Sequence, residues 1–133
     1  MTIQEFFKND RYAALSGVEL LEAAPGSAKA TMPIKDLHLN AGNAVQGGAI
    51  FTLADLTFAA AINAYGKMTV SVETSIRYFK SVASGTLFAE AKVLDLHKVL
   101  ATVEVRITNE ANELIALFTA TAYRKDIPLS FEF

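Results

Sequence analysis

Residues 40–55 read NAGNAVQGGAIFTLAD, a polar loop followed by two glycines and the start of a long apolar segment. Gly47 and Gly48 let a ligand approach the backbone closely, because neither carries a Cβ. A helix that begins here offers free N–H groups and a dipole that favour a developing negative oxygen. Asp55 lies about two turns further on among apolar residues, where a carboxylate must be paired, neutralised or functional. Oxyanion donors together with one carboxylate suit acyl transfer or hydrolysis.

A purely structural explanation of these features stays open at this point. Two glycines before a helix also make a tight turn, and a mid-helix aspartate often pairs with an arginine or a hydroxyl group. The residues alone therefore suggest a site without establishing one.

The apolar segment is long enough to raise the question of a membrane span. Ala44 to Ala64 is 21 residues long and contains one charged side chain, Asp55. A carboxylate in the middle of a span is costly in lipid, and Gln46 and Thr52 dilute the hydropathy further. We therefore predict a helix over residues 49–64 that is buried in the protein on nearly all sides, and no membrane partner.

The hydrophobic period changes after this helix, which Gly66 is suited to end in a left-handed conformation. Residues 69–78 alternate as a strand, and one face is predicted to carry Val70, Val72, Thr74, Ile76 and Tyr78. Ser71 falls on the other face. Further strands are predicted at 18–24, 28–34, 86–95, 99–108 and 114–124, with a helix at 3–15. Strands clustered after one long helix indicate an α+β fold with an antiparallel sheet.

Composition narrows the class of protein. The chain has 133 residues, enough for one domain over residues 1–133, and 52% are hydrophobic, which predicts surface buried between subunits. The net charge of −2 gives no basic bias, so nucleic acid is a poor partner. The absence of cysteine excludes disulfides and thiol nucleophiles, and two histidines give no metal-ligand cluster. Residues 1–12 lack the pattern of a signal peptide, so a cytoplasmic location is expected.

The central segment resembles the hotdog-fold thioesterases, specifically the PaaI-like group named for phenylacetic acid degradation. Their signature runs Asn, a glycine-containing loop, His-Gly-Gly, and a helix reading hydrophobic-Ala-Asp. Asn40, the run Gln46-Gly47-Gly48 and the run Leu53-Ala54-Asp55 match in order and spacing. The resemblance extends over roughly residues 10–125. It implies a long central helix wrapped by a curved antiparallel sheet of about five to six strands.

The resemblance also implies catalytic roles, residue by residue. Asp55 would act as nucleophile or general base on the thioester, and the N–H of Gly47 would polarise the carbonyl oxygen. Asn40 would orient the water or the carboxylate, and Ser71 matches a hydroxyl that some members use beside the acid. In the family, the residues matching Asn40, Gln46 and Gly47 come from one subunit, and those matching Asp55 and Ser71 come from its neighbour. The site would then exist only in a dimer.

One position departs from the family pattern. The family histidine is Gln46 here, a neutral donor and acceptor of similar reach that cannot titrate near neutral pH. If the histidine mainly positions the thioester, glutamine suffices; if it tunes charge, activity should be low or the substrate different. His38 is a conceivable substitute, but we predict a solvent-facing loop residue there. His97 receives no role.

Cations are expected near the mouth of the site, because coenzyme A carries phosphates. Lys80 and Lys98 sit where related sequences often place Arg or Lys, and Gly48 joins them as a weaker substrate contact. For either position alone, an ordinary solvated lysine is the better explanation. No cofactor and no metal are implied.

The function implied is hydrolysis of an acyl-CoA or aryl-CoA thioester by a homo-oligomer, a dimer or a dimer of dimers that forms a homotetramer. A non-catalytic acyl-CoA or small-ligand binding protein of the same fold is the main alternative. A hydroxyacyl-thioester dehydratase is a third possibility, disfavoured because such enzymes use a catalytic histidine that this helix lacks. A purely structural oligomer would leave Asp55 unexplained. The acyl group stays open.

Overall fold

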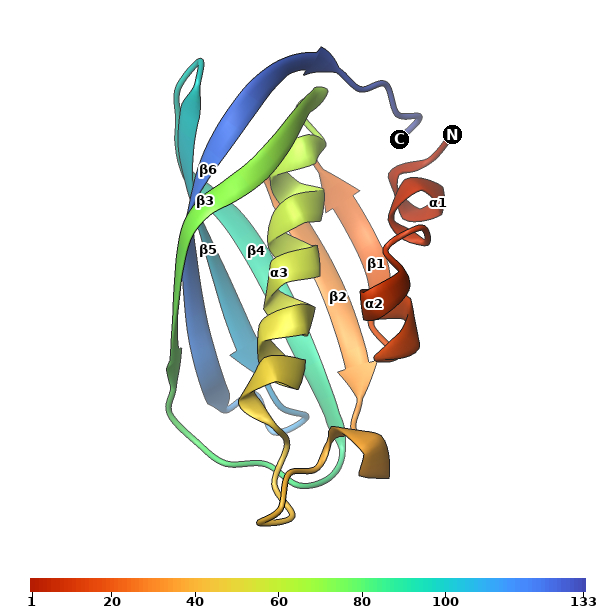
Figure 1. Ribbon diagram of the computed structural model, residues 1–133, viewed down its shortest axis with the longest axis vertical. Coiled ribbons are helices and arrows are strands. Elements are labelled where there is room, and N and C mark those ends of the chain that lie inside the picture. The colour runs from red at the N-terminus through yellow and green to blue at the C-terminus, as the bar shows by residue number, and fades with distance from the viewer.

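A computed structural model describes all residues, 1–133, as one six-stranded antiparallel sheet curled around a central helix (Figure 1). Its elements are α1 Ile3–Phe7, α2 Arg11–Leu15, β1 Glu19–Ala24, β2 Ser27–Pro33, the short 3-10 helix η1 Asp36–His38, α3 Gly47–Asn63, β3 Lys67–Tyr78, β4 Thr86–Leu96, β5 Leu100–Thr108 and β6 Leu114–Pro128. The strand order is β1-β2-β4-β5-β6-β3, so β1 and β3 form the two edges. The predicted α+β architecture is confirmed.

Helix α3 is the centre of the core. Its buried side chains are Ile50, Leu53, Ala54, Leu56, Thr57, Phe58, Ala60, Ala61, Ile62 and Asn63. One narrow stripe, defined here by Gly48, Thr52, Asp55 and Ala59, stays partly or fully exposed. These positions follow a spacing of three or four residues and therefore line one side of the helix. No helix of the structure is both long and apolar enough to span a membrane.

The strands that follow α3 bury one face against it, as their alternation predicts. Ala89, Ala91, Val103, Val105, Phe118 and Ala120 are each at most 2% exposed. Small residues dominate this face, so the sheet backbone comes close to the helix. The N–H of Gly26, in the β1–β2 turn, even donates to the carbonyl of Ala61 at 3.1 Å.

The predicted faces of β3 are wrong at its start, because a β-bulge interrupts the pairing with β6. Ser71 pairs with Ala122, and the register then shifts before Glu73. Residues that pair across strands share a face, so Ser71 lies on the face of the buried Ala122. Val70 pairs with exposed Tyr123 and is 38% exposed, and Val72 is 59% exposed. The bulge thus exchanges the faces on which Val70 and Ser71 lie.

The single helix predicted at 3–15 is also wrong, since the chain forms two short helices there. Asp10 separates them: its carboxylate accepts the N–H of Ala13 at 3.1 Å and so caps the second helix. The two helices pack beside β1 and α3, and the chain termini lie next to each other (Figure 1).

The end of α3 is fixed to β3 by one buried side chain. Asn63 donates to the carbonyls of Ala59 and Thr69 and accepts the N–H of Thr69 at 2.8 Å. Gly66 turns the chain between them with φ of 90°, the left-handed conformation that its position predicts.

We expect Asn63→Ala to lower the free energy of unfolding by about 2–3 kcal/mol, because it strands buried backbone groups of Thr69. Urea unfolding measures this change. Asn9→Ala, on the surface, serves as the matched control and should change stability by less than about 0.5 kcal/mol. Equal effects of the two variants would show that Asn63 does not join the helix to the sheet.

Candidate active site

The loop before α3 is held by Asn40. Its Oδ1 accepts the N–H groups of Gly42 at 2.9 Å and Ala44 at 3.2 Å, while its own N–H donates to the Ala44 carbonyl at 2.7 Å. Two backbone donors fix the orientation of the side-chain amide. Its Nδ2 group is left without a partner in the chain, so Asn40 can donate to a ligand but cannot accept from one.

Gln46 caps α3 and is oriented in the same manner. Its Oε1 accepts the N–H of Gly48 at 2.8 Å, so its Nε2 group is also left as a free donor. A Cβ at Gly48 would lie 2.5 Å from that Oε1, which explains why glycine follows the cap so closely. Gln46 therefore presents a neutral donor.

The N–H of Gly47 is the free backbone donor at the start of α3. No acceptor for it exists in the chain, whereas the N–H groups of Gly48 and Ala49 both bond to Gln46. A pocket of about 320 Å³ adjoins it, lined by Asn40, Ala44, Val45, Gly47, Ile50, Tyr78, Phe79, Lys80, Ser81 and Val82. The structure thus brings the predicted residues Asn40 and Gly47 to one pocket, while Gln46 lines a neighbouring pocket of about 480 Å³ that also contains Asn40.

Asp55 lies on the uncovered stripe of α3 and has no partner. It forms no ion pair, and none of the side-chain hydrogen bonds of the chain reaches it. Burial, and secondarily the negative charge of Asp10, raise the pKa of the Asp55 carboxyl above its ordinary value. A carboxylate in such a place must be paired, neutralised or functional, and the structure excludes pairing within the chain. A raised pKa also makes Asp55 a stronger base once it is ionised.

Ser71 does not join Asp55 within one chain. Its hydroxyl is exposed and takes part in no hydrogen bond, although the bulge in β3 places it on the inner face of the sheet. Its role beside the acid stays a prediction.

The helix itself keeps Asp55 away from the donors. Gly47 and Asp55 are eight residues apart in α3, which corresponds to about 12 Å along the axis. A thioester carbonyl at the Gly47 N–H is therefore out of reach of the Asp55 carboxylate of the same chain. Each chain carries both halves of the predicted chemistry, in separate places.

The two predicted cations differ in position and in pairing. Lys80 lines the pocket at Gly47, but it forms an ion pair with Glu113, whose pKa this hydrogen bond lowers. Lys98 lies in the exposed β4–β5 turn. Val93, near that turn, bonds to Gly26, which in turn bonds to Ala61 near the end of α3. Lys98 therefore lies at the opposite end of the helix from Gly47, and one chain does not bring the lysines together.

The expectation that His38 faces solvent is wrong. His38 is 3% exposed, its Nδ1 accepts the N–H of Lys35 at 2.9 Å, and its Nε2 lies 2.6 Å from the carbonyl oxygen of Ser16. Both ring nitrogens are occupied by backbone groups, which requires a proton on Nε2. His38 ties the loop to the end of α2 and cannot replace the family histidine. His97 lies on the surface beside Asp95.

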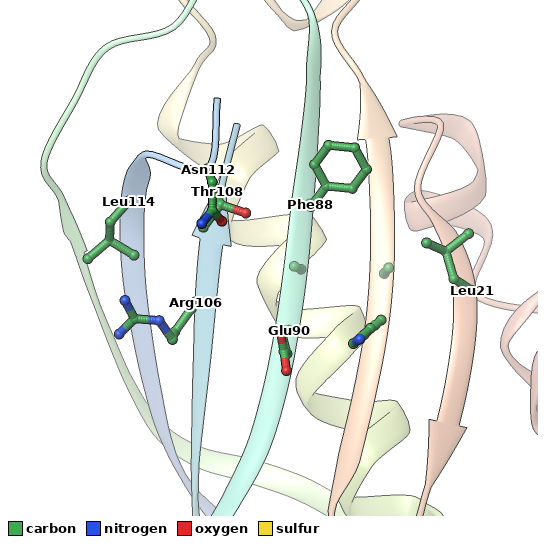
Figure 2. Close-up of a pocket in the computed structure, with 10 residues that line it drawn as sticks. Leu21, Phe88, Glu90, Arg106, Thr108, Asn112 and Leu114 are labelled. Atoms are coloured by element: carbon green, nitrogen blue, oxygen red, sulfur yellow. The ribbon is translucent and has the colours of Figure 1, made fainter. Parts of the chain in front are cut away.

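A second pocket, of about 340 Å³, lies elsewhere on the sheet and contains none of these groups. Figure 2 shows it on the face of the sheet away from α3, with Leu21, Phe88, Glu90, Arg106 and Leu114 around it. Phe88 and Glu90 lie on either side of the buried Ala89 in β4, so their side chains point to the opposite face and the pocket opens on the outer side of the sheet.

Tyr78 lies at the start of α3, although no motif in the sequence predicts a role for it. Its hydroxyl donates to the carbonyl oxygen of Gly47 at 2.9 Å. The available signal was its position at the end of a strand, on the face that looks toward α3.

Fold and site together define a thioester hydrolase of the hotdog type: a helix start with free donors, and an unpaired carboxylate on the same buried helix. The sequence pattern of the thioesterase superfamily matches residues 42–116, and the chain belongs to this family. A candidate esterase of Archaeoglobus fulgidus is 45% identical over 125 residues, covering 92% of this chain and 81% of its own. The acyl-coenzyme A thioesterase PaaI of Escherichia coli is 30% identical over 119 residues, covering 89% and 85%.

Solved structures agree with this assignment. The structure of Escherichia coli PaaI superposes with a TM-score of 0.90 at 28% identity, covering 95% of this chain and 92% of that one. A mutant of the phenylacetic acid degradation protein PaaI of Thermus thermophilus gives a TM-score of 0.83 at 32% identity, covering 87% and 100%. The predicted PaaI-like resemblance, hotdog fold and thioesterase activity are confirmed.

We expect Asp55→Asn to raise the thermal unfolding temperature at pH 7 by a few degrees, because a half-buried, unpaired charge disappears. The raised pKa of Asp55 means that the folded state disfavours the carboxylate. Wild-type stability should therefore fall as pH rises from the ordinary pKa of about 4 through the raised one. The difference between variant and wild type should vanish near pH 4. Asp95→Asn, at the exposed His97 contact, is the control and should not raise the unfolding temperature. If Asp55→Asn were instead less stable than wild type at pH 7, Asp55 would be paired in the assembled protein.

Proposed function

We propose that the protein hydrolyses acyl-CoA thioesters at a site shared between two copies of the chain. The observation that carries the proposal is the pair of unpartnered groups on α3, the Gly47 N–H and the Asp55 carboxylate. The acyl-CoA substrate is supported by the similarity to the acyl-coenzyme A thioesterase PaaI of Escherichia coli, and by the 35% identity over 106 residues to human acyl-coenzyme A thioesterase 13.

In the proposed reaction, the thioester carbonyl oxygen accepts hydrogen bonds from the Gly47 N–H and from the free amide donors of Asn40 and Gln46. The ionised Asp55 of the other copy removes a proton from water as the water oxygen adds to the carbonyl carbon. The electrons of the C=O bond move to the oxygen, where the donors stabilise the negative charge. The carbon–sulfur bond then breaks, and the CoA thiolate leaves with the proton that Asp55 took. Acid and CoA are released, and no cofactor is needed.

The shared site is supported by the edge of the sheet. Strand β3 is 12 residues long, forms an edge, and carries the exposed apolar side chains Val70 and Val72. A long unpaired edge of this kind is a natural surface for a second copy. If two copies join about a twofold axis that sets their α3 helices antiparallel and centred near Phe51, Asp55 of each faces Gly47 of the other. Phe51 is midway between these residues in the sequence.

The proposed enzyme is a cytoplasmic homotetramer made of two such dimers. The hydrophobic share of 52% supports additional buried surface between subunits. Ser71 would stand beside the water near Asp55, as the family pattern implies. Lys80 would receive a CoA phosphate after release from Glu113, with Lys98 and Gly48 as further substrate contacts.

The test is a panel of short, medium, long and aryl acyl-CoAs, with release of free CoA thiol as the signal. We expect wild type to hydrolyse at least one class, and Asp55→Asn to lower kcat on the order of 10² or more, as for loss of a general base. The raised pKa of Asp55 places one acid limb in the pH–rate profile, above the ordinary value for aspartate, since protonation removes the base.

Asp95→Asn is the matched control and should keep the wild-type rate. Binding of acyl-CoA without any hydrolysis by wild type would contradict the enzyme and favour the binding protein. Normal hydrolysis by Asp55→Asn would remove Asp55 from the mechanism.

A further inference from the structure

Tyr78 contacts the start of α3 in two ways. Its hydroxyl donates to the Gly47 carbonyl at 2.9 Å, and its ring lies against the Gly47 backbone. A Cβ added at Gly47 would lie 3.0 Å from the Tyr78 oxygen and 3.1 Å from the ring carbon that bears it. The close approach of Tyr78 therefore depends on glycine at position 47.

The bond from Tyr78 continues into Gln46 through one peptide group. The Gly47 carbonyl and the Gly48 N–H belong to the same planar unit and point in opposite directions. That N–H donates to Oε1 of Gln46 at 2.8 Å. A hydroxyl that holds the oxygen end of the unit also fixes the direction of its N–H end, and it polarises the second hydrogen bond. Tyr78, this peptide and Gln46 thus form a continuous chain of hydrogen bonds.

We propose that Tyr78 is a positioning residue, which orients the Gly47–Gly48 peptide so that Gln46 presents Nε2 as a side-chain donor to the thioester oxygen beside the Gly47 N–H. The inference rests on the proposed function and deepens it. It supplies a reason why a neutral glutamine serves where the family pattern has histidine: the relay fixes the direction of the amide, and no charge is required.

The chemistry of Tyr78 fits this role across the working pH range. A backbone carbonyl only accepts, so the Tyr78 hydroxyl must be the donor. Burial raises the pKa of Tyr78 above its ordinary value of 10.0, so the donor proton is retained at neutral pH. Tyr78 lines the pocket at Gly47, but its single hydroxyl proton is donated to the Gly47 carbonyl, so in this arrangement it acts on the thioester oxygen through Gln46.

Tyr78→Phe is the direct test, since it keeps the ring against Gly47 and removes only the donor. We expect kcat to fall about five- to tenfold, the rate equivalent of one hydrogen bond, with KM changed less than about twofold. Tyr123→Phe is the matched control. Tyr123 is a half-exposed tyrosine on the neighbouring strand with no side-chain hydrogen bond, and it should keep wild-type kinetics.

A double-mutant cycle separates positioning from simple packing. In a Gln46→Ala background, Tyr78→Phe should lower kcat by less than about twofold further, because the group through which it acts is gone. Wild-type kinetics in Tyr78→Phe, or effects of the two changes that multiply independently, would overturn the relay while acyl-CoA hydrolysis stands.

A measurement that does not depend on catalysis tests Tyr78 even if wild type hydrolyses no acyl-CoA and the proposed function fails. The Gly48 amide proton resonance reports the bond to Gln46. It should move in Tyr78→Phe, in the direction seen for Gln46→Ala, and stay in place in Tyr123→Phe. An unmoved resonance in Tyr78→Phe would overturn the relay independently of activity.

Discussion

The rigid length of α3 between Gly47 and Asp55 is the constraint on which the site depends. Eight residues of helix separate the free Gly47 N–H from the Asp55 carboxylate by about 12 Å, and no side-chain rotation closes that distance. The helix cannot bend to help, because its buried side chains pack against the sheet along its whole length. One chain therefore cannot bring the Gly47 N–H and the Asp55 carboxylate to the same thioester, which is the reason for proposing that a second copy completes the site.

The geometry of α3 also explains why the Gly47 N–H and the Asp55 carboxylate have no partners within the chain. At its start, Gln46 satisfies the N–H groups that follow Gly47 and leaves the Gly47 N–H itself free. Along the uncovered stripe, Thr52 and Ala59 lie about one turn to either side of Asp55, and these small side chains leave room for another surface. An unpaired, half-buried carboxylate opposes stability, so its presence is better explained by function than by folding.

Much of the fold was predictable from local pattern, because period, glycines and buried alternation act over a few residues. The long helix, the left-handed Gly66 and the inner faces of β4 and β6 follow from such signals. The errors arise where one residue overrides the pattern. Asp10 caps a second helix and breaks the first, and the bulge after Ser71 exchanges the faces of β3. Neither the Asp10 cap nor the β-bulge changes the hydrophobic period from which helices and strands are predicted.

In the candidate site, too, some features were predictable from local sequence and others were not. Asn40, Gly47 and Asp55 could be found from the motif, whereas the tertiary contacts around them could not. Three contacts join residues that a pattern in a single sequence does not connect. They are the bonds of His38 to two backbone groups, the ion pair of Lys80 with Glu113, and the hydrogen bond of Tyr78 to Gly47.

Complementation between two inactive variants tests the shared site most directly. Asp55→Asn removes the acid, and Gly47→Pro removes the free N–H at the first helical position. Proline is tolerated at this position of a helix, and the extended conformation of the preceding Gln46, with ψ of 135°, is compatible with a following proline. Circular dichroism checks that the Gly47→Pro chain folds, since its ring must displace the Tyr78 side chain slightly. Each variant alone should be nearly inactive. After refolding together in equal amounts, random assembly should restore about a quarter of wild-type activity, because one site in four combines an intact donor chain with an intact acid chain. No recovery, with mixed oligomers demonstrated, would show that donor and acid act within one chain and would contradict the account.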